Sequence, residues 1–231
     1  LKIKNESKFL FNISNIVFSD GLKMEDIAIK CLDICLLLDD KSIKIKYALR
    51  LIEGNGVKTN VEKGESILKE LVSNDDPKAL FILGRRLVLD KSTNANKLEG
   101  KNYLIKSAEL GYIKAKVFLG GILIDGDIIG KDYDMAFRYL EDAVRNDDIW
   151  AKTILGDALI YGYSGKQDRA LGEKILREAC NLGNEKAKEI LANRLINGYE
   201  QHIQWYWDFL SNHITSSSSD EEYNEWSDME K

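Results

Sequence analysis

The sequence predicts an all-α chain built from helix pairs that repeat every 36 residues. The 231 residues contain a single Pro, a residue that removes a backbone donor and interrupts helices. Alanine recurs at an interval of 36, and so does a Leu-Gly pair at the fourth and fifth residues after the first three of these alanines. Recurrence at one fixed interval is the signature of a repeat architecture. The recurring positions are Ala79, Ala115, Ala151 and Ala187, and Gly84, Gly120 and Gly156.

Two helical stripes of small and apolar residues lie in each repeat. In residues 79–87 the first stripe follows i, i+1, i+4, i+5 and i+8, and in residues 100–108 the second stripe follows i, i+3, i+4, i+7 and i+8. Gly inside a helix costs about 1 kcal/mol relative to Ala. Its recurrence therefore predicts that the two helices of a pair approach closely where Gly or Ala occurs.

Turn residues separate the two helices of each pair. Gly54, Gly126 and Gly162 follow the first helix, where a left-handed residue ends it. Short links join consecutive repeats, which forces neighbouring helices to run antiparallel and stacks the pairs. The positions expected to cap the second helices are Asn60, Asn96, Asp132 and Asp168.

The two ends of the chain depart from the regular pattern. Residues 1–42 read as a degenerate leading repeat, with helices at 6–18 and 23–38. Residues 201–214 are rich in Trp, Tyr and Phe and predict a capping helix for the exposed end of the stack. Residues 215–231 form an acidic tail. The leading repeat and the capping helix enclose the repeats 43–78, 79–114, 115–150 and 151–186 and the half repeat 187–200.

These motifs resemble the Sel-one-like repeat (SLR) family, a 36-residue relative of the tetratricopeptide repeat. The shared pattern is A-x-x-x-L-G, a Gly-containing loop, a helix with small residues, and then L-G followed by Tyr or Asn. The resemblance covers about two-thirds of the chain, although Leu87, Leu123 and Leu159 stand where the family usually has Tyr. It implies a right-handed α/α superhelix that mediates the assembly of protein complexes.

The resemblance also implies which side chains line the concave groove of the superhelix. Lys78, Lys114 and Lys186 would form a basic row, with Trp150 in the remaining slot. The alternative is that these lysines are solvated residues that begin each helix. Exposed aromatic side chains beside cations are typical of binding hot spots. The predicted groove residues are Lys78, Phe81, Arg85, Lys114, Trp150, Asp157, Tyr161, Lys186, Glu189 and Asn193.

The acidic tail is a second candidate for partner binding. It carries the whole net charge of −5, so the body before it is neutral, which argues against a nucleic-acid-binding function. Its mixture of acids with aromatics is typical of linear binding segments, and a solubilising tail is the alternative. The residues concerned are Asp220, Glu221, Glu222, Tyr223, Glu225 and Trp226.

No catalytic, metal or cofactor site is predicted. Cys31 and Cys35 share a helix face but offer only two ligands, so they and Cys180 read as small core residues. His202 and His213 would lie about 16 Å apart on one helix, too far to share a metal. One branch of the resembled family has been linked to β-lactam hydrolysis and carries paired, disulfide-linked cysteines in every repeat, whereas the cysteines here do not repeat.

The sequence therefore predicts a non-catalytic protein-protein interaction module, an adaptor, scaffold or assembly factor. A dedicated inhibitor, such as an immunity protein that neutralises a toxin, is the alternative, and a β-lactam hydrolase a remote one. We expect a protein partner, no nucleic acid and no membrane span, because no apolar run reaches 18 residues. Three cysteines cannot form a disulfide framework, which favours a reducing compartment, the cytoplasm first and an organelle matrix second. The oligomeric state stays open.

Overall fold

The structure is a computed structural model that describes residues 8–14, 25–37, 40–55, 57–89, 94–163 and 167–196. These residues form α-helices joined by short turns, and no strand occurs among them. The all-α prediction is confirmed. The predicted capping helix at 201–214 and the acidic tail at 215–231 lie outside the described residues.

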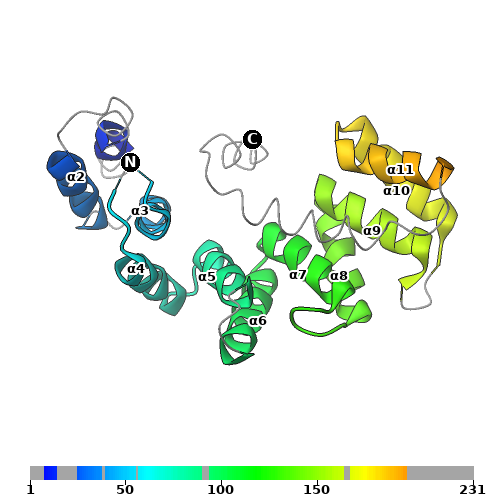
Figure 1. The fold of residues 1–231 in the computed structure, drawn as a ribbon, viewed down its shortest axis with the longest axis horizontal. Helices are drawn as coiled ribbons and strands as arrows, with labels where there is room; N and C mark the ends of the chain where they lie inside the picture. The colour runs from blue at the N-terminus through cyan, green and yellow to red at the C-terminus, as the bar shows by residue number, and fades with distance from the viewer. Residues whose placement is uncertain are drawn as a thin grey trace. The chain divides into compact units, whose positions relative to one another are not determined.

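The helices alternate between first and second members of the predicted pairs (Figure 1). Their boundaries recur at intervals of 36 with few exceptions, the main one being an early start of α6. The first helices are α3 (Lys41–Glu53), α5 (Pro77–Leu89), α7 (Ile113–Asp125), α9 (Ile149–Tyr161) and α11 (Glu185–Ile196), and the second helices are α2 (Glu25–Leu37), α4 (Val61–Ser73), α6 (Asn94–Glu109), α8 (Tyr133–Arg145) and α10 (Arg169–Asn181).

The described chain divides into two compact units, and the boundary lies between Ala79 and Leu80. In the first unit, α2, α3 and α4 bury Leu32, Tyr47 and Leu68. The second unit has one continuous core that extends to α11. Its first helices α7 and α9 are buried over most of their length, whereas α8 and α10 bury a single stripe.

Glycine allows the backbones of a helix pair to touch. A Cβ atom added at Gly84 would lie 2.9 Å from the carbonyl oxygen of Gly100, and one added at Gly172 would lie 2.6 Å from that of Gly156. At Gly120 an added Cβ would instead meet the side chain of Leu140 at 2.6 Å. All these distances are too short for a real Cβ contact. The prediction that small residues mark close helix crossings is confirmed.

Side chains cap both helices of a pair. Three of the four predicted caps of second helices are confirmed: Asn60, Asp132 and Asp168 accept hydrogen bonds from backbone N–H groups three residues later. The prediction for Asn96 is wrong, because α6 begins at Asn94 and places Asn96 in its first turn. The sequence analysis overlooked the caps of the first helices, which lie at multiples of 36 residues from one another, although Tyr112 at the equivalent position before α7 makes no such bond. These caps are Asp40, Asp76, Asp148 and Asn184.

Each of the four links that the structure describes in full, those that enter α5, α7, α9 and α11, contains one residue in the left-handed region. Gly111 and Gly183 adopt φ of 89° and 91°, and Asp75 and Asp147 occupy the equivalent positions with φ of 55° and 59°. Asp tolerates this region better than most residues but at higher energy than Gly. The four positions lie 36 residues apart and share this backbone conformation.

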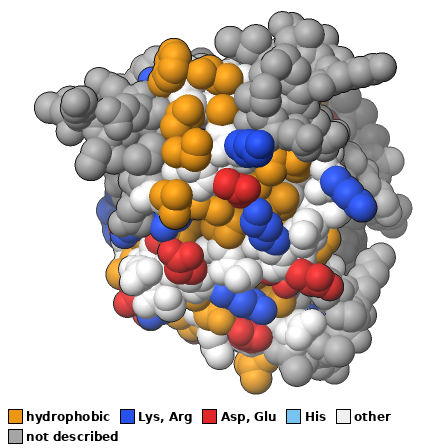
Figure 2. All heavy atoms as spheres, turned by 90° about the vertical axis from the view of Figure 1, so that its left-hand side faces the viewer, with side chains coloured by type: hydrophobic (Ala, Val, Ile, Leu, Met, Phe, Trp, Pro, Cys, Tyr) orange, Lys and Arg blue, Asp and Glu red, His pale blue; other side chains and the backbone are white. Residues whose placement is uncertain are grey.

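The leading repeat keeps the spacing of the others. Its helix α2 lies 36 residues before α4, as predicted, and residues 8–14 are helical within the predicted range 6–18. Figure 2 looks onto the end of the molecule where α2 lies and shows hydrophobic side chains gathered on that face. Phe9, Ile34 and Leu37 are exposed in this unit. Cys31 and Cys180 are half-buried free thiols rather than full core residues.

Candidate protein-binding surface

The candidate surface consists of the second, fifth and ninth residues of each first helix in the second unit, which we call the first-helix row. These positions lie on one side of a helix, because three and four residues separate them. From α5 to α11 the row is Phe81 and Arg85, then Lys114, Val117 and Gly121, then Trp150, Thr153 and Asp157, then Lys186, Glu189 and Asn193.

An aromatic cluster forms the beginning of the row. The ring of Phe81 lies 5.4 Å from that of Tyr112 and 6.0 Å from that of Phe118, between centroids. The guanidinium of Arg85 lies 5.9 Å from the Phe81 centroid, within reach of a cation–π contact. The expectation that Phe81 is exposed is wrong: it is 8% exposed, because the two neighbouring rings cover it. Arg85 and Phe118 remain half-buried.

Lys114 and Trp150 are both half-buried in the middle of the row. Asp148 lies near both, and its carboxylate accepts a hydrogen bond from the backbone N–H of Ala151 at 2.8 Å. Burial raises the pKa of Asp148, and this backbone bond together with the positive charge of Lys114 partly offsets the rise. The structure thus places a cation and a large aromatic ring beside the start of α9.

Thr153 and Asp157 of α9 are completely buried. The hydroxyl of Thr153 donates a hydrogen bond to the backbone oxygen of Ile149, at 2.9 Å. Burial raises the pKa of Asp157 well above its usual range. In this conformation Asp157 offers no surface to a partner, so its assignment to a binding surface stays a prediction. Sequence periodicity placed the residue on the row but contained no information on its burial.

Three tyrosines gather at the end of α9. The rings of Tyr133 and Tyr163 stack at 5.9 Å, and those of Tyr161 and Tyr163 lie 6.4 Å apart. Burial raises the pKa of Tyr163, with a further contribution from the charge of Asp157. Tyr161, a predicted groove residue, is half-buried in this cluster.

The row ends in an open surface on α11. Lys186 is half-buried and pairs with Glu189, with 2.6 Å between Nζ and Oε2. Glu189 and Asn193 are exposed. Lys78 is half-buried at the start of α5, in the first unit. The tail residues 220–226 lie outside the described residues, and their assignment stays a prediction.

Lysines that link the two helices of a pair were not found by the sequence analysis. Lys44 contacts Glu70 at 3.0 Å, Lys152 contacts Glu178 at 3.6 Å, and Lys116 pairs with Asp142. In each case the acid follows the lysine by 26 residues. The signal was available, because these lysines recur at multiples of 36. They lie on the side of the first helix that faces its partner helix and are therefore structural rather than part of the row.

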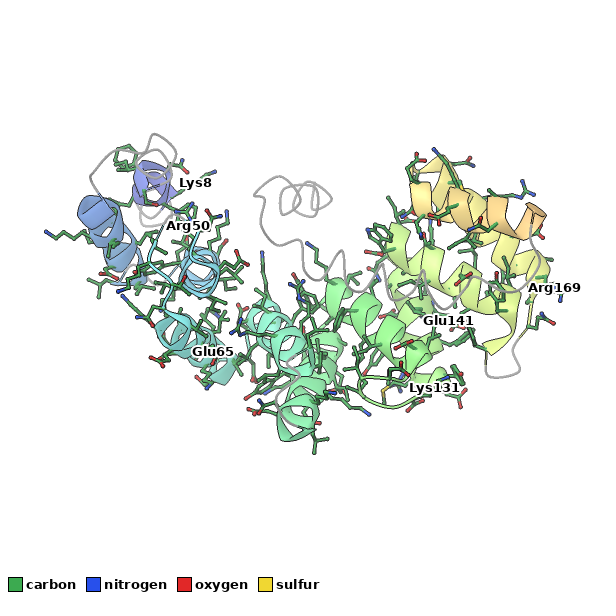
Figure 3. All side chains as sticks on the ribbon, in the orientation of Figure 1. Lys8, Arg50, Glu65, Lys131, Glu141 and Arg169 are labelled. Carbon is green, nitrogen blue, oxygen red and sulfur yellow. The ribbon has the colours of Figure 1, made fainter. Side chains whose placement is uncertain are left out.

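Exposed charges concentrate on the second helices and their loops. Figure 3 labels Lys131, Glu141 and Arg169, which come from the loop before α8, from α8 and from the start of α10, and all three are exposed. Within the described ranges, no group of three His, Cys, Asp or Glu side chains is arranged to hold a metal ion. None of the helices described is long and apolar enough to cross a membrane.

Comparison with known proteins supports the assignment of the fold. No family model and no curated protein matches the sequence. A Sel1 repeat protein from Oxalobacter formigenes is 18% identical with a TM-score of 0.67, and the match covers 97% of this chain and 87% of that one. A protective antigen with an SLR fold, present in uropathogenic Escherichia coli strains, is 19% identical with a TM-score of 0.68 over 84% of this chain, which spans 43% of that protein. The chain therefore has the fold of the Sel-one-like (Sel1-like) repeat proteins, an α/α superhelix of 36-residue helix pairs.

Proposed function

We propose that the chain is a non-catalytic protein-interaction module that binds a partner protein through the first-helix row. The observation that carries the proposal is the combination of Lys114, Trp150 and Lys186 at equivalent positions of α7, α9 and α11. All three are half-buried, so each is held by its surroundings and still reaches the surface. Ordered cations beside an aromatic ring are enriched in the centres of protein interfaces.

The charge of the row indicates the chemistry of the partner segment. Arg85, Lys114 and Lys186 place three cations along the row. A segment with acidic side chains spaced along an extended strand or a helix would complement them, and apolar side chains would fit beside Trp150 and Phe118. Complementary charge mainly raises the association rate and the selectivity of such an interface.

The proposal is tested with two charge-reversal variants that carry the same net charge. The row variant combines Lys114→Glu with Lys186→Glu, and the control combines Arg138→Glu with Lys174→Glu, two exposed positions on α8 and α10. The intact chain captures proteins from its source lysate, and the affinity of each captured protein is then measured with all three forms. We expect the row variant to weaken binding at least tenfold and the control less than twofold.

Two results would reject the proposal. Equal weakening by both variants would show that net charge, not the row, determines binding. The absence of any saturable protein ligand would remove the interaction module itself. Circular dichroism of both variants confirms that the comparison is made between folded chains.

A further inference from the structure

Helix α9 is buried on all sides, although only four of the described helices pack against it. Every residue from 151 to 160 is buried. The described helices that pack against α9 are α7, α8, α10 and α11. Roughly six helices of equal diameter fit around one helix at an axial spacing of about 10 Å. Four helices therefore leave part of the circumference to be covered by other segments. Tyr163, in the loop after α9, covers some of it, since it lies close enough to Asp157 to feel its charge, and the remainder is also shielded from solvent.

The shielded side includes the first-helix row. Gly156 faces α10, and at about 100° per residue Asp157 is turned by a quarter of a circle or more away from that contact. Asp157 and Thr153 are fully buried, and the equivalent Gly121 and Val117 of α7 are buried as well. On α11 the same two positions, Glu189 and Asn193, are exposed. The cover is therefore local to α7 and α9 and is not a property of every repeat.

Residues 201–214 have the composition to provide this cover. Their apolar side chains are Ile203, Trp205, Tyr206, Trp207, Phe209, Leu210 and Ile214.

The same segment does not fit the place of the next second helix. Continuing the interval of 36 from the buried stripe of α10 leads to Asp208, Ser211, Asn212 and Thr215, all polar. Furthermore, Ala192 of α11 is exposed, although the equivalent Gly156 is buried against its second helix. The apolar side chains of 201–214 are therefore out of register with the repeat and need another surface.

The length of the chain allows the segment to reach α9. Four residues, 197–200, separate the end of α11 from the segment and span up to about 14 Å when extended. This exceeds the spacing of about 10 Å between adjacent helices. A helix of 14 residues is about 21 Å long, close to the length of α9. The acids of the tail that follows would meet the cations Arg85 and Lys114 of the row.

We propose that residues 201–214 bind back onto the first-helix row over α7 and α9 and act as an intramolecular occupant of that surface. A partner that uses the middle of the row must displace this segment before it binds. This differs from an end cap, which would cover α11 and leave α9 open. The inference concerns the chain alone, so its test needs no partner and is independent of the proposed function.

The test measures the reactivity of a thiol placed under the proposed cover. Thr153→Cys is close to isosteric and is introduced into the full chain, with Glu189→Cys on exposed α11 as the matched control. Maleimide labelling is followed by peptide mass spectrometry, which separates these sites from the native cysteines. We expect Thr153→Cys to react at least tenfold more slowly than Glu189→Cys. Adding Trp205→Ser, Trp207→Ser and Phe209→Ser should accelerate labelling of Thr153→Cys at least tenfold and change that of Glu189→Cys less than twofold.

Three outcomes would overturn the inference. Thr153→Cys reacting as fast as Glu189→Cys would show that the face is open. Protection that persists in the folded triple variant would assign the cover to another element, and protection that depends on protein concentration would assign it to a second copy. If the triple variant loses helicity, mild oxidation of Thr153→Cys paired with Trp207→Cys or with Leu210→Cys decides, since the absence of any intrachain disulfide then rejects the proposal.

Discussion

The helix pairs α5–α6 and α9–α10 share one crossing and differ in their charges. Both cross where two glycines meet, Gly84 with Gly100 and Gly156 with Gly172. At the fourth position of the first helix, α9 has Lys152, which pairs with Glu178, whereas α5 has Leu80.

The acid that pairs with Lys152 in α9–α10 is also replaced in α5–α6. The position in α6 that corresponds to Glu178 is Lys106, so the pair without the first-helix lysine also lacks the acid. The ninth position differs too, being the half-buried Arg85 in α5 and the fully buried Asp157 in α9. The comparison indicates that these two pairs share the backbone contact, and that the ion pair is replaced as a unit.

The largest expected effect comes from filling the shared crossing. Gly172→Ala and Gly100→Ala should each lower the free energy of unfolding by about 1–3 kcal/mol, because the new Cβ would press on a backbone oxygen. In an unconstrained helix the same change would raise it by about 1 kcal/mol. Urea denaturation measures whether each variant has a lower or a higher free energy of unfolding than the original chain. Lys174→Ala, at an exposed position of α10, should change stability by less than about 0.5 kcal/mol, and a stabilising Gly172→Ala would refute the close crossing.

Substitution of Asp157, at the ninth position of α9, should give the second largest change in the free energy of unfolding, and this change should depend on pH. Burial raises the pKa of Asp157 in the folded state, so the folded chain loses stability as pH rises from the unfolded pKa of about 3.9 through the folded pKa. Asp157→Asn should therefore raise the free energy of unfolding by about 1–2 kcal/mol at pH 7, and this gain should disappear near pH 4.

Asp142→Asn serves as the control with the opposite sign. The hydrogen bond from Lys116 lowers the pKa of Asp142, so its contribution is present above pH about 3.9 and is lost as pH falls through the folded pKa. Because Asp142 is partly exposed, we expect a loss of less than about 1 kcal/mol at pH 7. Identical pH profiles for the two variants would contradict the assigned pKa directions.

A double-mutant cycle tests whether the ion pair is exchanged as a unit. Glu178→Lys should destabilise the chain by about 0.5–1 kcal/mol, since it places two cations side by side. In the background Lys152→Leu, which reproduces the α5–α6 combination, the penalty should vanish. Thermal denaturation at low and high salt measures the coupling, which screening should reduce. An equal penalty in both backgrounds would show that the two positions act independently.

The smallest effects are expected at the links that enter α5 and α9. Asp75→Gly should raise the free energy of unfolding by up to about 1 kcal/mol, because Gly adopts a positive φ at no steric cost. Asp147→Gly should gain less, since the Asp147 carboxylate accepts a hydrogen bond from Lys152 at 2.9 Å. Parallel urea titrations of both variants give the difference, and a larger gain at Asp147 would contradict this role of the carboxylate.

Most of the fold could be predicted because its determinants are periodic. The interval of 36 residues located the close crossings at Gly84 and Gly156 and the turn at Gly126. Asn96 shows the limit of this reasoning: the periodic position holds a suitable residue, yet the local sequence starts the helix two residues earlier.

The candidate surface could be predicted in position but not in exposure. Periodicity places Phe81, Asp157 and Asn193 on one row, but the rings of Tyr112 and Phe118 cover the first of them. Asp157 is buried and Asn193 is exposed. Burial depends on contacts between distant residues that do not repeat, so a pattern in the sequence contains no record of it.

The matching helix boundaries have a consequence for the length of the molecule. Each of α3, α5, α7 and α9 has 13 residues, and the links that enter α5, α7 and α9 each contain a left-handed residue at the equivalent position. A 36-residue block such as 115–150 can therefore be duplicated or removed in frame, and the helices on both sides of the splice will keep their phase within the repeat. Chain length in this architecture is thus a discrete variable that genetic recombination can change by one block at a time without shifting the register of the helices.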